Sequence, residues 1–116
     1  MGALTLQVAV SLAGQAIAAG RTISAAPLAI AVLDGGGHLV TLQREDGASL
    51  LRPQIAIGKA WGAIALGKGS RLLALDAPGQ VLGAMGISGD TSDIDEQCAI
   101  RAIEALGLMA DAGVSA

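Results

Sequence analysis

One histidine and one lysine stand out as residues that could do chemistry on a small molecule. His38 is the only histidine, and it follows three consecutive glycines. Its imidazole could be a general base, a ligand of a metal or haem iron, or an ordinary hydrogen-bonded turn residue. Lys59 lies in a mostly apolar segment. Its amine could reach solvent, or it could line a pocket as an acid, base or nucleophile.

The residues around His38 favour a pocket rim. Arg44 could hold a carboxylate with two parallel hydrogen bonds, or it could form an ion pair with Asp34 or Asp46 that shapes the turn. Both aspartates precede glycine, which is ordinary turn chemistry. Glycines let a backbone approach a ligand closely. The candidate ligand-binding residues are Asp34, Gly36, Gly37, His38, Arg44, Asp46 and Lys59.

A further acidic pair, Asp95 and Glu96, falls where the last predicted helix begins. Carboxylates there stabilise the helix dipole, but Glu96 could also serve as a pocket acid or base. The candidate catalytic residues are therefore His38, Lys59 and Glu96. Possible metal ligands are scattered along the chain, so we predict no metal site. We expect Cys98, on an apolar helical stripe, to be a core thiol.

Hydrophobic periodicity and turn residues predict the order helix, hairpin, helix, strand, helix. We expect the helices to start near residues 4, 49 and 91, with Gly20 capping the first and Gly113 ending the last. The predicted strands are 28–33, 38–44 and 80–88, and residues 71–75 could add a turn or a short strand. Trp61, the only aromatic residue, is expected to pack in the core.

The composition sets limits on the class of protein. The 116 residues fit one domain, 1–116, in which 53% of residues are hydrophobic and 15% are charged. Such apolar content predicts large exposed patches and therefore self-association. The seven basic residues form no run, which excludes a nucleic-acid footprint. A single cysteine favours a reducing, cytoplasmic compartment. Polar residues interrupt the apolar N-terminal stretch, so neither a membrane span nor a secretory signal is expected.

Three segments carry a recognisable pattern, in this order: Ala-Val-Leu-Asp-Gly-Gly-Gly-His-Leu-Val at 31–40, Arg-Glu-Asp-Gly-Ala at 44–48 with the Lys-Ala of 59–60, and Gly-Ala-Met-Gly-Ile-Ser-Gly at 83–89 with Asp95 and Glu96. Together they resemble the GlcG/HbpS family, to which the C-terminal domain of PduO is similar. The resemblance implies an α+β, profilin-like sandwich, an antiparallel sheet covered by helices, that forms higher oligomers. This chain is shorter before the final Gly-rich strand, which predicts a reduced sheet with an exposed edge.

The resemblance implies binding more than catalysis. The favoured hypothesis is an oligomeric binding or accessory protein that holds a haem-like or other small anionic ligand near His38, Arg44 and Lys59. Haem is suggested as a ligand by the family resemblance alone. The second hypothesis is a cofactor-independent isomerase, cyclase or lyase of a catabolic or biosynthetic pathway. The third is a structural subunit. The sequence leaves open whether there is any catalysis.

Overall fold

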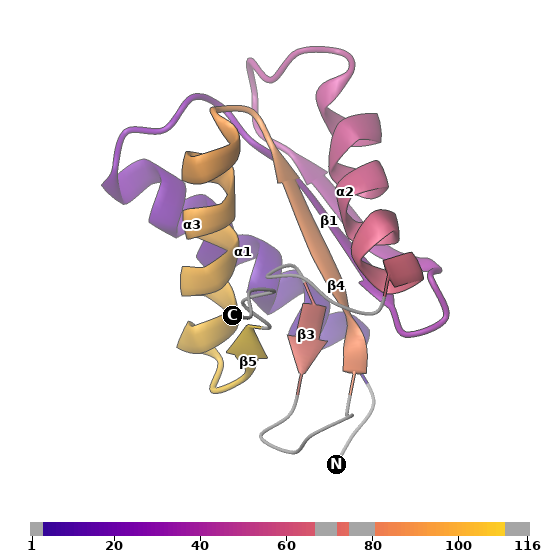
Figure 1. Ribbon diagram of the computed structural model, residues 1–116. Coiled ribbons are helices and arrows are strands. Elements are labelled where there is room, and N and C mark those ends of the chain that lie inside the picture. Colours follow the sequence, from indigo (N-terminus) through magenta and orange to yellow (C-terminus); the bar gives the residue numbers. More distant parts are fainter. Residues whose placement is uncertain (1–3, 67–71, 75–80, 111–116) are drawn as a thin grey trace.

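The fold is a sheet between two layers of helices. The computed structural model of the chain describes residues 4–66, 72–74 and 81–110. In these ranges α1 and α3 lie side by side on one face of the sheet and α2 covers the other (Figure 1). The elements are α1 (Leu6–Thr22), β1 (Ala29–Asp34), β2 (Leu39–Arg44), α2 (Arg52–Leu66), β3 (Leu72–Ala74), β4 (Val81–Ser88), α3 (Ser92–Ala105) and β5 (Met109–Ala110). The predicted antiparallel sheet covered by helices is confirmed.

The described strands are ordered β2-β1-β4-β3-β5, and every neighbouring pair is antiparallel. At one end of β1, Asp34 pairs with Gly83, so the β1–β2 turn lies beside the start of β4. At the other end, Ala29 pairs with both Arg44 and Ser88. In the shortened segment between α2 and β4, the described residues include the three-residue strand β3, which pairs with β4 and with β5.

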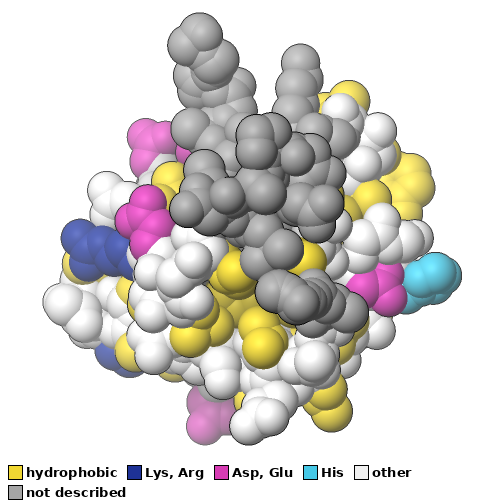
Figure 2. All heavy atoms as spheres, turned by 90° about the horizontal axis from the view of Figure 1, so that it is seen from below, with side chains coloured by type: hydrophobic (Ala, Val, Ile, Leu, Met, Phe, Trp, Pro, Cys, Tyr) yellow, Lys and Arg dark blue, Asp and Glu magenta, His cyan; other side chains and the backbone are white. Residues whose placement is uncertain are grey.

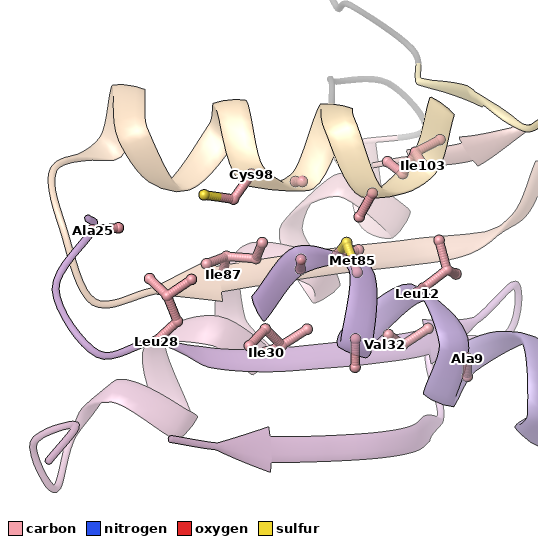
Figure 3. Close-up of a cluster of buried hydrophobic side chains, with 14 residues drawn as sticks. Ala9, Leu12, Ala25, Leu28, Ile30, Val32, Met85, Ile87, Cys98 and Ile103 are labelled. Atoms are coloured by element: carbon pink, nitrogen blue, oxygen red, sulfur yellow. The ribbon is translucent and has the colours of Figure 1, made fainter. Parts of the chain in front are cut away.

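The main core fills the space between the sheet and the helices α1 and α3. Figure 3 shows this core on the face of the sheet that α1 and α3 cover. Ile30 and Val32 of β1 lie there with Met85 and Ile87 of β4, and Leu12 of α1 packs among them. Cys98 is also fully buried here, as predicted. Removing apolar surface of this kind from water is the main stabilising term in folding.

The opposite face of the sheet is packed with small residues. Ala56 and Ala60 of α2 are fully buried against Ala31 and Ala84 of the sheet. Gly86 of β4 is essential to this contact, because a Cβ there would overlap the carbonyl oxygen of Ala56. The small side chains therefore bring α2 close to the sheet.

Two predicted helix ends are wrong. Gly20 does not cap α1 but is buried within it, against the side chain of Leu28, and the helix continues to Thr22. The last helix ends at Ala105 because Gly107 adopts φ +75°, and the N–H of Leu108 donates to the carbonyl of Ile103. Met109, predicted on that helix, therefore lies in β5. Gly113 lies outside the described residues.

The observed helix starts agree better with the predicted ones than the helix ends do. Thr5 and Thr91 cap α1 and α3, and each hydroxyl oxygen accepts a hydrogen bond from the backbone N–H three residues later. The α2 helix begins at Arg52, after a turn in which its N–H donates to the Ser49 carbonyl. Among the described helices, none combines the length and apolar character needed to cross a membrane.

Candidate functional site

A tightly hydrogen-bonded turn joins β1 to β2. The carboxylate Oδ1 of Asp34 accepts hydrogen bonds from the N–H of Gly36 at 2.9 Å and of His38 at 3.0 Å. Gly37 adopts φ +85°, which favours glycine. The hydrogen bond from the His38 N–H, helped by that from Gly36, holds the pKa of Asp34 below its usual value. Asp34 therefore stays ionised and fixes the loop.

The imidazole of His38 folds back over this turn. Its Nδ1 lies 3.4 Å from Oδ1 of Asp34, and the side chain is 81% exposed. Gly36 makes room for it, since a Cβ at Gly36 would come within 3.0 Å of Nδ1. Figure 2 shows the histidine projecting at the edge of the molecule beside an acidic side chain. With Nδ1 directed to the carboxylate, Nε2 is the nitrogen left for a ligand.

Exposed apolar side chains lie near the turn that carries His38. Trp61 was predicted to be a core residue, but its side chain is exposed, at 58%. Alanines occupy the sheet-facing positions of α2, and the helix lies too close to the sheet for an indole there. The ring instead lies near the turn, with Nε1 3.7 Å from the position that a Cβ would take at Gly37. Leu39 is also exposed, so the turn has apolar neighbours on both α2 and β2.

A second, largely buried polar cluster lies at the far end of β4. The Nζ of Lys59 donates to the carbonyl of Ile87 at 2.7 Å and lies 3.3 Å from Oδ2 of Asp95. The side chain of Asp95 is only 2% exposed and that of Lys59 20%. Oδ1 of Asp95 accepts the N–H of Asp90 at 2.9 Å. Lys59 thus links α2, β4 and α3.

Arg52 and Ser88 extend this cluster. An Nη1 of Arg52 donates to the hydroxyl of Ser88 at 3.2 Å, and Ser88 is fully buried. Sequence reasoning missed both residues, and it treated Asp95 only as a helix-dipole carboxylate. The available signal was Lys59 itself, because an amine in an apolar segment needs a buried partner.

The predicted ligand-binding residues fall into two groups. Asp34, Gly36, Gly37 and His38 form the turn. Arg44 ends β2 at the opposite end of the sheet, where it pairs with Ala29, about 20 Å from His38 along the strand. Its Nη1 donates to the Ala48 carbonyl at 2.9 Å, and no ion pair with Asp34 or Asp46 occurs among the described residues. Asp46 is exposed in the following turn.

The predicted catalytic residues are separated in the same way. Lys59 meets β4 at Ile87, and Asp95, next to Glu96, completes that contact from the first turn of α3. The register places Ile87 four residues from Gly83, the partner of Asp34, which is about 13 Å along the sheet. A single chain therefore does not bring His38 to Lys59. In the described part of the chain, no three His, Cys, Asp or Glu side chains could hold a metal ion.

The free thiol offers no alternative ligand. Cys98 is buried in the main core, and desolvation raises its pKa above the usual value. A thiol in this state is a weak nucleophile and a weak metal ligand.

The chain is therefore an α+β domain, in which an antiparallel sheet lies between two layers of helices and the first hairpin carries an exposed histidine. A family model described as haem degrading protein HbpS-like matches residues 4–78. The chain therefore belongs to the HbpS-like family, which confirms the resemblance seen in the sequence.

Solved structures share the fold. The PduOC:haem complex aligns with a TM-score of 0.83 at 21% identity, covering 94% of this chain and 99% of that one. The Klebsiella pneumoniae protein ORFY aligns at 0.80 and 24% identity, with 90% of each chain covered. HbpS aligns at 0.76 and 25% identity, with 91% of each covered. A search of curated protein sequences gave no significant match.

Proposed function

We propose that the protein is an oligomeric small-molecule-binding or accessory protein, whose ligand is haem-like or another small anion. The observation that carries the proposal is the geometry of His38. Asp34 holds the turn through the His38 N–H and lies 3.4 Å from Nδ1, which leaves Nε2 available to a ligand. Membership of the HbpS-like family and the likeness to a haem complex support the same ligand class.

The residues present fit haem in part. His38 would hold the iron through Nε2, and the exposed side chains of Trp61 and Leu39 would contact the apolar ring. When bound, haem supplies a redox-active iron. The work of this chain is to orient the imidazole, since Asp34 facing Nδ1 favours the tautomer that carries its proton there. One chain leaves His38 81% exposed, so in the proposed oligomer another subunit would supply further walls around a haem.

Exposed apolar side chains support the oligomer. Apolar surface exposed on a soluble protein can mark an interface between subunits. The large hydrophobic residues exposed in the described part of the chain lie on several elements; they are Leu6, Val10, Leu39, Leu42, Leu50, Leu51, Ile55, Trp61, Leu66 and Val81. We place this assembly in the cytoplasm, because the single cysteine is reduced and buried and contributes no crosslink.

A haem titration tests the proposal. Saturable binding should shift the Soret band and quench the fluorescence of Trp61, the only tryptophan, because it lies beside the His38 turn. His38→Ala should weaken binding at least about tenfold, the loss of a modest ligand contact. Gln97→Ala, on the exposed face of α3, is the control and should bind as the unmodified protein does. Equal binding by the His38→Ala variant would remove His38 from the site.

A further inference from the structure

The strand β2 is an open edge of the described sheet. It stands at the end of the strand order, outside β1 (Figure 3). The N–H of Asp34 donates to the His38 carbonyl and the N–H of Glu45 to the Leu28 carbonyl, which fixes the groups that face β1. Because alternate residues face opposite ways, the N–H and C=O of Leu42 and Arg44 point outward. Unpaired groups along an open edge are a template on which a strand of another chain can pair.

We propose that β2 pairs antiparallel with β2 of a second copy, about a two-fold axis at Leu42, and that this pairing completes the ligand site. The inference rests on the proposed function insofar as His38 is a ligand residue. One chain separates His38 from Arg44 and Asp46 by the length of the strand. Antiparallel pairing brings Arg44 and Asp46 of one copy beside His38 of the other.

The side chains of β2 suit this register. Leu42 is 38% exposed and would pack against Leu42 of the second copy, and apolar cross-strand pairs stabilise sheets. Arg44 would stand opposite Val40, so no like charges meet. Asp46, which is exposed and acidic, would lie near the imidazole of the other copy. A two-fold axis repeats each contact, so one patch serves both copies.

The completed site has a defined chemistry. Each dimer holds two equivalent sites, each with His38 from one chain and Arg44 from the other. Paired strands lie about 5 Å apart, so Arg44 comes within side-chain reach of a ligand on His38. The guanidinium has one Nη1 on the Ala48 carbonyl and keeps further donors for an anion. The site therefore takes an anionic molecule that offers a carboxylate to Arg44 and a metal centre or an acidic proton to Nε2 of His38.

Cysteine crosslinking tests the register. Leu42→Cys should form a disulfide-linked dimer under mild oxidation, because residues in a hydrogen-bonded antiparallel pair have Cα atoms about 5.5 Å apart. Thr41→Cys and Gln43→Cys are matched controls that crosslink only if the axis is shifted by one residue. Cys98 is buried and should not react. Crosslinking at either control position but not at residue 42, or at none of the three, overturns the proposal.

Edge disruption tests the site. Leu42→Pro removes an outward N–H and leaves the β1–β2 hydrogen bonds intact. Leu42→Lys adds a charge to the edge and serves if the proline variant fails to fold, as judged by circular dichroism. Both should lose the β2-mediated dimer in sedimentation and bind haem at least about tenfold more weakly.

The outcomes separate the two proposals. If the protein crosslinks at residue 42 but does not bind haem, the strand pairing is supported and haem is excluded as the ligand. Undiminished haem binding by a folded, unpaired Leu42 variant overturns the claim that the pairing completes the ligand site and keeps the proposed function.

Discussion

The Lys59–Asp95 ion pair is the polar contact whose loss should most destabilise the fold. Lys59→Met keeps the aliphatic chain but leaves the Asp95 carboxylate, 2% exposed, and the Ile87 carbonyl without their cationic donor. Breaking a buried ion pair costs about 3–5 kcal/mol. Since the Lys59 side chain is 20% exposed, we expect the lower end, about 3 kcal/mol. Removing both charges in Lys59→Met/Asp95→Leu should recover part of that free energy.

Urea denaturation measures this prediction, with far-UV circular dichroism at one fixed protein concentration. With a typical urea slope of about 1.5 kcal/mol/M, the midpoint should fall by about 2 M. Asp93→Asn, on an exposed residue of the same helical turn, is the control and should change the free energy of unfolding by about 0.5 kcal/mol. A Lys59→Met loss below about 1 kcal/mol at an unchanged slope would refute the reasoning.

Three further predictions concern the loop at one end of the sheet, the contact between α2 and the sheet, and the exposed side of α2. Hydrogen bonds, first from the N–H of Ala26, hold the pKa of Asp90 below its usual 3.8, so its stabilising effect is complete above that pH and is lost as the pH falls through the lowered pKa. Asp90→Asn should therefore flatten the fall in thermal midpoint below about pH 4, and parallel curves would contradict this. Gly86→Ala should destabilise the fold by about 3 kcal/mol or more, because its Cβ overlaps the carbonyl of Ala56. Gly58→Ala, in the open middle of α2, should instead stabilise it by about 0.5–1 kcal/mol in the same urea assay.

Local signals in the sequence were enough for most of the fold. The Gly-rich turn and the flanking apolar runs located the β1–β2 hairpin, and the two threonine caps depend only on neighbouring residues. The prediction that Gly20 ends α1 failed because this glycine is needed for a tertiary contact: its missing side chain makes room for Leu28. Gly107 was passed over because the apolar periodicity continued to Met109, whereas the left-handed residue and its hydrogen bonds decided the helix end.

The site was less predictable, because it depends on strand register. Asp34 and His38 are close in sequence, and their contact could be anticipated. The Lys59 partner could not, since Asp95 lies 36 residues away on another helix. Composition suggested a buried Trp61, but the small residues that draw α2 onto the sheet leave no space for an indole. His38 and Arg44 share one hairpin, yet they stand at its opposite ends.

Native mass spectrometry of the protein purified without added ligand tests the central claim most directly. It reports the number of subunits and any retained small molecule in one spectrum. The account predicts an oligomer with an even number of chains that carries haem or another small anion, which His38→Ala releases while the chains stay together. A monomer free of any ligand, or a ligand retained unchanged by the His38→Ala variant, would contradict it.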